Sequence, residues 1–170
     1  MKLERKALVH FLDSSFKNIV ASATWFKIGI DMEELSVSLN PDTSSKKNIW
    51  GESRVEDNGY EPSIDADPYY ANPDEPLYPK LREIAMDRLV GDKCKTLILE
   101  VIVDDTEATN HLAYIEEVIV KPQSYGGGTS GVNIPYNVAF NGSRKKGYVT
   151  KTSFDEGNPT FTEGTIPSGS

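Results

Sequence analysis

Alternation of apolar and polar residues predicts β-strands along most of the chain. The alternation is clearest in residues 24–30 and 34–41, which a short connection joins, so we expect a β-hairpin there. Residues 94–105 and 112–125 are rich in valine and isoleucine, residues that favour strands, and predict two further strands. Residues 60–66 alternate more loosely and predict another strand.

A second hairpin is expected near the C-terminus. Residues 132–140 and 144–154 both have the pattern of strands, and Asn141-Gly142 lies between them. Asparagine and glycine accept the positive φ values that a type I′ turn requires, so this pair is a strong hairpin signal.

Residues 76–90 have the pattern of an amphipathic helix. Their apolar residues recur at helical spacing, and Asp74 and Gly91 stand where an N-cap and a C-terminal cap are expected. About seven or eight strands with a single covering helix predict a mainly β fold, either a β-sandwich or a partly closed barrel with one flanking α-helix.

The pattern also divides the chain into segments. We expect a β domain over residues 19–151, preceded by an N-terminal arm, 1–18, and followed by a flexible C-terminal tail, 152–170. Within the domain, residues 40–60 are mostly polar and predict a long excursion from the core. The glycine run 126–128 is expected to be a flexible link.

Composition is that of a globular domain, with 38% hydrophobic and 26% charged residues. No apolar run reaches the ~20 residues of a membrane span, and residues 1–13 lack the apolar core of a signal peptide. We therefore expect no membrane insertion and a chain made and first used in a cytoplasm. The net charge of −8 is uneven, because residues 31–75 hold three basic and twelve acidic residues, a balance of −9. Such a block disfavours a nucleic-acid groove, which needs clustered cations.

Searches for catalytic and cofactor motifs find none. The nucleophile elbow G-x-S-x-G is absent, and the string SYGGGTSG lacks the lysine of a phosphate-binding loop. His10 and His111 have no neighbours at zinc-ligand spacing and are expected at the surface, while Cys94 is expected to be a buried or idle thiol. The cluster 144–146 is expected to be a solvated turn. We therefore expect no enzyme, no metal site and no cofactor.

The stretch EPSIDADPYY concentrates negative charge in Glu61, Asp65 and Asp67. The glycine and alternating oxygen ligands of an EF-hand loop are missing, although a looser calcium site that adds Asp57 and Asn58 stays open. The preferred interpretation is a surface that needs only negative charge.

Large apolar residues are scattered through the polar segments. Isolated anchors of this kind suggest docking onto another subunit, and the alternative is that they pack on their own core. The candidate contact residues are Phe11, Phe16, Ile49, Trp50, Phe154 and Phe161.

Two long segments carry a resemblance to a known family. EPSIDADPYYANPDEPLYPKLREIAMDRLVGD and EEVIVKPQSYGGGTSGVNIPYNVAFNGSRKKGYVT resemble the major tail (tail tube) proteins of long-tailed bacteriophages, over roughly residues 50–150. The resemblance implies a β-sandwich or barrel with one flanking helix. It also implies hexameric rings whose inner strands form a continuous channel, stacked into a tube through residues 40–60, 1–18 and 152–170.

The resemblance further implies a virion protein, located in the tail and assembled in the cytoplasm of the host bacterium. Its partners would be copies of itself, the tape-measure and tail-terminator proteins, and the baseplate or tip proteins. Double-stranded DNA would only pass through, without specific binding. Glu61, Asp65 and Asp67 could then line an acidic lumen that repels DNA, or form an interface with the basic N-terminal segment of a neighbour.

Two alternatives stay open. One is the tube subunit of a contractile injection or secretion device. The other is a monomeric β-sandwich that binds carbohydrate or calcium, with Trp25, Trp50, Tyr69 and Tyr70 as a platform for stacking sugars.

Overall fold

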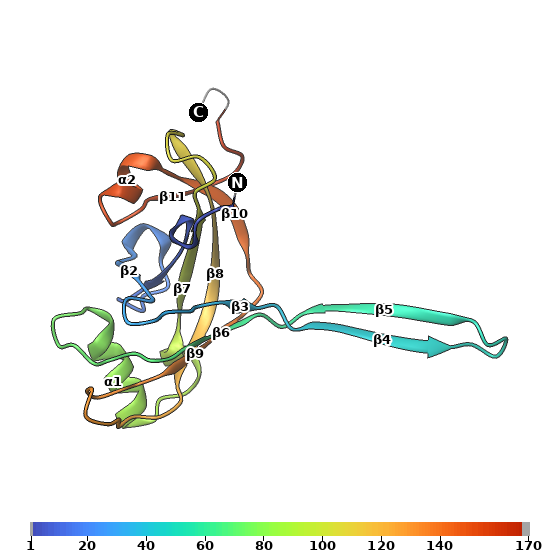
Figure 1. Ribbon diagram of the computed structural model, residues 1–170, viewed down its shortest axis with the longest axis horizontal. Helices are drawn as coiled ribbons and strands as arrows, with labels where there is room; N and C mark the ends of the chain where they lie inside the picture. The colour runs from blue at the N-terminus through green and yellow to red at the C-terminus, as the bar shows by residue number, and fades with distance from the viewer. Residues whose placement is uncertain (1, 168–170) are drawn as a thin grey trace.

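The body of the protein is one curled antiparallel sheet that forms a half-barrel (Figure 1). The computed structural model describes residues 2–167. Nine strands pair in the order β2-β1-β7-β8-β9-β6-β3, with β10 between β8 and β11. Their bounds are β1 Leu8–Asp13, β2 Trp25–Lys27, β3 Val37–Ser38, β6 Ser63–Ala66, β7 Lys95–Ile102, β8 Asn110–Pro122, β9 Tyr136–Phe140, β10 Lys145–Thr150 and β11 Phe161–Glu163. The expected mainly β fold, a partly closed barrel with a flanking helix, is confirmed.

The centre of the sheet is the β7–β8 hairpin, which confirms the two valine- and isoleucine-rich strands. Its register runs from Lys95 opposite Ile119 to Ile102 opposite Leu112. Within β7, six consecutive residues from Thr96 are buried, because both faces of the sheet are covered.

The hairpin expected at residues 24–41 is wrong. β2 pairs with β1, with Phe11 opposite Lys27, whereas β3 pairs with β6, with Val37 opposite Ile64. The two strands therefore lie at opposite ends of the main strand order. The pairing also corrects the expectation that residues 1–18 form an arm outside the β domain, because β1 lies between β2 and β7 inside the sheet.

The hairpin expected at Asn141-Gly142 is also wrong. β9 and β10 both pair with β8, one after the other along the same edge, so the chain continues in one direction through residues 141–144. These residues bulge opposite Glu116 and Glu117, and Gly142 supplies the required positive φ of 89°. β8 is long enough to pair with both strands, and these ladder hydrogen bonds replace the local turn.

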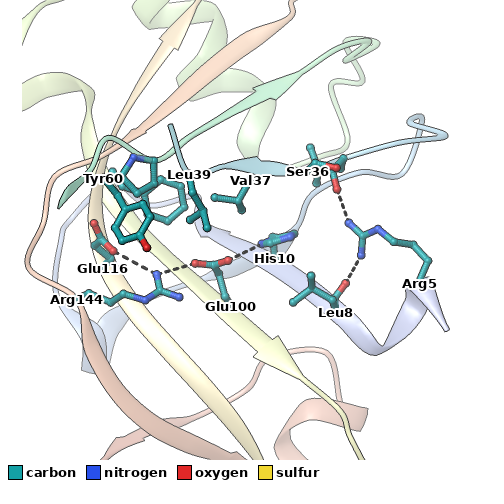
Figure 2. Close-up of a pocket in the computed structure, with 13 residues that line it drawn as sticks. Arg5, Leu8, His10, Ser36, Val37, Leu39, Tyr60, Glu100, Glu116 and Arg144 are labelled. Carbon is teal, nitrogen blue, oxygen red and sulfur yellow. Dashed lines mark hydrogen bonds and ion pairs between the residues drawn. The ribbon is translucent and has the colours of Figure 1, made fainter. Parts of the chain in front are cut away.

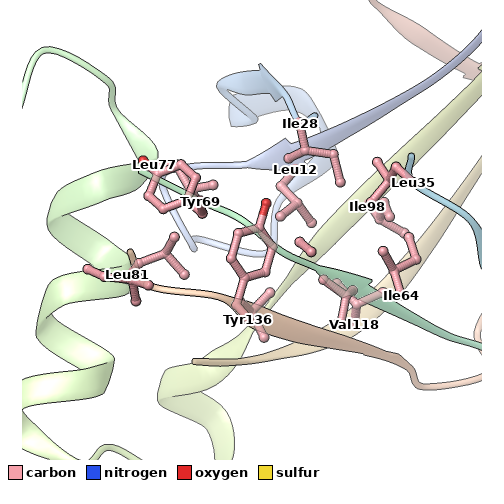
Figure 3. Packing of buried hydrophobic residues seen from close by; sticks show 14 residues of the cluster. Leu12, Ile28, Leu35, Ile64, Tyr69, Leu77, Leu81, Ile98, Val118 and Tyr136 are labelled. Atoms are coloured by element: carbon pink, nitrogen blue, oxygen red, sulfur yellow. The ribbon is translucent and has the colours of Figure 1, made fainter. Parts of the chain in front are cut away.

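Two clusters of apolar side chains fill the two faces of the sheet. The inner face of the half-barrel packs on α1, Leu77–Asp87, and includes Leu12, Leu81 and Tyr136 (Figure 3). The helix is confirmed, but its expected caps are not. Pro76 takes the N-cap position with no side-chain hydrogen bond, and the helix ends at Arg88 in the left-handed conformation, φ 52°.

The outer face is covered by the segment expected to be a flexible tail. α2, Lys151–Asp155, and β11 follow β10, and Phe154 lies edge-to-face against Phe11 with ring centroids 6.2 Å apart. The tail expectation is therefore wrong for residues 152–163, because Phe154 and Phe161 pack on the outer apolar cluster. Its last residues, 168–170, lie outside the described residues.

The short elements and the glycine run complete the body. Residues 2–167 contain three 3-10 helices: η1 Arg5–Ala7, η2 Val20–Ser22 and η3 Gly91–Cys94. The run 126–128 opens a tight turn in which Gly126 and Asn133 exchange backbone hydrogen bonds of 3.2 and 2.7 Å. A Cβ on Gly127 would overlap the carbonyl oxygen of Gly131, so the run is a packed turn and not a free link. No helix in residues 2–167 combines the length and apolar character needed to cross a membrane.

Gly147 lets β11 lie close against β10. A Cβ at this position would overlap the Thr162 carbonyl oxygen and the Phe161 ring. We expect Gly147→Ala to lower the free energy of unfolding by about 1–3 kcal/mol, because the added methyl overpacks this contact. Urea unfolding measures the change. Gly128→Ala is the control, since a Cβ there meets no atom within 4 Å; equal midpoints for the two variants would contradict the close packing.

The excursion of residues 40–60 is an ordered hairpin that projects away from the body (Figure 1). Its strands are β4, Pro41–Lys47, and β5, Ser53–Tyr60, which pair only with each other. We call this hairpin the arm. Its base is fixed by hydrogen bonds from the Glu61 amide to the Leu39 carbonyl, 3.1 Å, and from Asn40 Nδ2 to the Glu61 carbonyl, 3.0 Å.

Candidate functional site

The arm carries two large apolar side chains at its tip. Ile49 is 92% exposed and Trp50 is 77% exposed. The side-chain oxygen of Asn48 accepts hydrogen bonds from the backbone amides of Trp50 and Glu52, both at 3.0 Å. The tip is therefore a hydrogen-bonded turn that holds both apolar groups in solvent.

The rest of the arm lacks a covering layer. Nearly all residues of β4 and β5 are exposed, including Val55. A two-stranded hairpin by itself is only marginally stable in water. An exposed arm with an apolar tip is thus typical of a surface that another molecule covers.

A pocket of about 640 Å³ opens beside the base of the arm (Figure 2). Its walls are largely apolar, and its floor is charged. The wall residues are Leu8, Leu35, Val37, Leu39, Tyr60, Pro62 and Phe140, and the floor residues are His10, Glu100, Glu116 and Arg144. Arg5 fixes one side, because its guanidinium donates to the carbonyl oxygens of Leu8, 2.6 Å, and Leu35, 2.7 Å.

The floor is a cluster of ionisable side chains drawn from three strands and the bulge; His10, Glu100 and Glu116 are buried, and Arg144 is partly exposed. Arg144 Nη1 lies 2.8 Å from Glu100 Oε1 and 3.2 Å from Glu116 Oε1. His10 Nδ1 lies 3.3 Å from Glu100 Oε2. The Arg144 guanidinium also stacks over the Tyr114 ring, 4.6 Å from its centroid. We call His10, Glu100, Glu116 and Arg144 the charge cluster.

The electrostatics of the cluster favour the ionised form of the Glu100 carboxyl. Burial alone would raise the pKa of Glu100, but His10 and Arg144 together outweigh burial and lower that pKa below its usual value. Burial acts against the charge of Arg144 as well, yet its hydrogen bonds to Glu100 and Glu116 raise the guanidinium pKa. Arg144 therefore holds two carboxylates together in a place where neither is well solvated.

The structure corrects one expectation about the histidines, since His10 and His111 were expected at the surface but are both buried. Arg144, Lys145 and Lys146 were expected to be solvated, and all three are exposed, but Arg144 also reaches from the bulge to the two glutamates. The expectation that Cys94 is buried is confirmed.

The predicted contact residues divide into two groups. Phe11 is buried in the outer apolar cluster, with Phe154 and Phe161 packed against it, and Phe16 packs against the inner cluster. These four follow the alternative in which apolar residues pack on their own core. Of the six, only Ile49 and Trp50 are largely exposed.

The acidic residues of the stretch EPSIDADPYY are exposed and separate. Asp65 accepts a 2.7 Å hydrogen bond from Asn137, and Asp67 accepts one of 3.3 Å from Asn133. Glu61 is exposed at the base of the arm. Across residues 2–167 there is no group of three or more histidine, cysteine or acidic residues placed to hold a metal ion. The looser calcium site is therefore not formed, because Asp57 and Asn58 belong to the arm.

The proposed sugar platform is not formed either. Trp25 is buried in the outer cluster and Tyr69 in the inner cluster, whereas Trp50 lies at the tip of the arm. These aromatic rings thus share no surface.

The sequence matches no protein-family model, and a search of curated proteins returns no match.

Proposed function

We propose that this chain is a structural subunit that assembles with copies of itself into hexameric rings, stacked as the tail tube of a long-tailed bacteriophage. The observation that carries the proposal is the arm, an ordered hairpin with Ile49 and Trp50 exposed at its tip. A projecting hairpin with an apolar tip has little use on a monomer, and it is typical of a contact between subunits.

The position of the arm favours heterologous contacts, in which one surface of a copy meets a different surface of the next copy. Its seven-residue strand β4 extends the tip about 25 Å from the body, at ~3.4 Å per residue. In this proposal, the tip of one copy meets a different surface on another copy. Heterologous contacts of this kind build rings and open stacks, which is what a tube requires.

The edges of the sheet support association within a ring. The main sheet order ends at β2 and β3, each paired along one side only in the part of the chain that the structure describes. Unpaired strand edges offer backbone donors and acceptors to a neighbouring chain. Pairing between the sheets of adjacent copies would extend the half-barrels into a closed wall.

The exposed acids fit a channel for DNA. Asp65 and Asp67 are exposed and could face a lumen, where like charge keeps double-stranded DNA from binding the wall, whereas Glu61 at the base of the arm is placed for a contact between copies. In this proposal the chain acts in the virion tail, after assembly in the host cytoplasm, with tape-measure, terminator and tip proteins as partners. The role is structural, and DNA is carried without specific recognition.

Imaging of the purified chain tests the proposal. Negative-stain electron microscopy and size-exclusion chromatography over a range of concentrations are expected to show rings or hollow tubes. The double variant Ile49→Ser, Trp50→Ser is expected to stay dispersed while keeping its circular dichroism spectrum. Val90→Ser, which changes an exposed apolar residue after α1, is the matched control and should assemble normally. Single particles at every concentration, with or without the tail-tip complex of the same virion, would overturn the proposal.

A further inference from the structure

The inner face of the half-barrel changes character along its length. At one end, Leu12, Ile98 and Val118 belong to the inner apolar cluster. Two residues further along the same strands, on the same face, stand His10, Glu100 and Glu116. The apolar core therefore ends at the charge cluster, and beyond it the half-barrel stays open as the pocket of about 640 Å³.

His10 indicates that the pocket takes a polar group. Its side chain is 2% exposed, and Nε2 has no hydrogen-bond partner among the described residues. Buried polar atoms are nearly always satisfied, so a lone ring nitrogen beside an open pocket calls for a partner. The walls around it are apolar, which is typical of a site that holds an amphipathic side chain.

We propose that this pocket receives Ile49 and Trp50 from the arm of a second copy. The inference rests on the proposed function and adds the site at which the tip binds. Tryptophan suits the pocket because its ring is apolar and its indole N–H can donate to His10 Nε2 or to a carboxylate of the charge cluster. Residues of this kind are the usual anchors of protein interfaces.

The charges agree with this occupant. Two guanidinium groups, of Arg5 and Arg144, face the two carboxylates at the pocket, and Glu61 adds a negative charge at the adjoining rim. Beside the tip, Lys47 and Arg54 make no ion pair within residues 2–167. Docking would bring these two cations toward Glu61 at the rim of the pocket.

The arm cannot fill the pocket of its own chain. Tyr60 and Leu39 stand at the base of the arm and line the pocket, while the tip lies about 25 Å away along β4. Each copy thus has a tip at one end and a receiving pocket at the other. Copies joined in this way form an open series, in agreement with stacked rings.

Crosslinking between two cysteines tests the site directly. In the full-length chain, Ile49→Cys is combined with Leu39→Cys, which places a thiol at the mouth of the pocket and keeps Trp50. The matched control combines Ile49→Cys with Val90→Cys, because Val90 is exposed but lies outside the pocket. The native Cys94 is buried and stays in all variants.

A short bis-maleimide is added to the assembled protein, and the products are separated on a denaturing gel. The Ile49→Cys, Leu39→Cys variant is expected to give a ladder of trimers and longer products, because each chain carries both halves of the contact. Each single variant can give only dimers. Assembled tubes with no ladder beyond that of the Val90 control would overturn the pocket assignment and leave the proposed function standing. Dispersed chains with no crosslinks in any variant would overturn both.

A charge placed at the pocket supplies a second test. Leu39→Asp is expected to raise the concentration needed for assembly about 10-fold or more, because the tip meets a carboxylate in place of an apolar wall. Circular dichroism and thermal unfolding of the monomer verify that the variant is folded. Assembly of folded Leu39→Asp at the concentration of the unaltered chain would count against the pocket.

Discussion

Replacing Phe11 with alanine is expected to lower the free energy of unfolding by about 3–5 kcal/mol. Phe11 lies on β1 with 1% of its surface exposed, and it contacts Phe154 edge-to-face. Truncation would leave a cavity where β1 and α2 pack, and these elements are far apart in the chain. Urea unfolding of the monomer, read by circular dichroism, measures the change.

Ile49→Ala is the matched control for Phe11→Ala. Ile49 is exposed at the tip of the arm, so this substitution is expected to change the free energy of unfolding by no more than ~0.5 kcal/mol while weakening assembly. Phe11 is thus expected to stabilise the fold, and Ile49 to serve assembly. A Phe11→Ala chain with unchanged stability and defective assembly would show that Phe11 is a subunit contact after all.

Arg144→Met is the substitution with the second largest expected effect. We expect it to lower the free energy of unfolding by about 2–3 kcal/mol. Removing one partner of a buried ion pair costs ~3–5 kcal/mol, because the other charge is left buried and unpaired. Here Glu100 and Glu116 both lose their cation, but the Arg144 side chain is 40% exposed, so water already screens part of the interaction. Lys145→Met, at the next and exposed position, is the control.

The pH dependence identifies the cause of this loss. The folded pKa of Glu100 lies below its usual value of 4.5, so its contribution is present above about pH 4.5 and is lost as the pH falls through the folded pKa. In Arg144→Met the burial of Glu100 remains and the guanidinium that helps to lower its pKa is gone, so the carboxyl pKa should rise. The stability deficit of the variant is therefore expected to be largest near neutral pH and to shrink in acid. A deficit that stays constant down to about pH 3 would assign the loss to packing against Tyr114.

Local sequence patterns predict most strands and the helix of this fold, but they do not predict which strands pair with each other. The period of the valine- and isoleucine-rich segments predicts β7 and β8, and the apolar stripe of residues 77–84 predicts α1. Strand pairing is decided by long-range contacts. Asn141-Gly142 has the sequence of a hairpin turn, yet the free edge of β8 offers more hydrogen bonds to a continuing strand. β2 likewise pairs with β1, whereas the local pattern predicts that it pairs with residues 34–41.

The candidate site is predictable only in part. The sequence predicts that residues 40–60 leave the core and names Ile49 and Trp50 as contact candidates, but it does not predict the hairpin or its tip. The same argument also selects four phenylalanines that pack on the core, because isolation in the sequence does not show which apolar residues stay exposed. The charge cluster escapes sequence reasoning, because its members come from positions 10, 100, 116 and 144. A signal is present, since Glu100 and Glu116 interrupt apolar strand sequences, and charged residues rarely occupy such positions unless they are paired.

The length of the arm would set the spacing between copies in the proposed stack. Both of its strands leave the body at one place and pair only with each other, so its length can change without disturbing the half-barrel. Adding two residues to each strand would lengthen it by about 7 Å and keep every side chain on its original face. In a stack joined through the arms, the hairpin would therefore act as a spacer that sets the axial repeat.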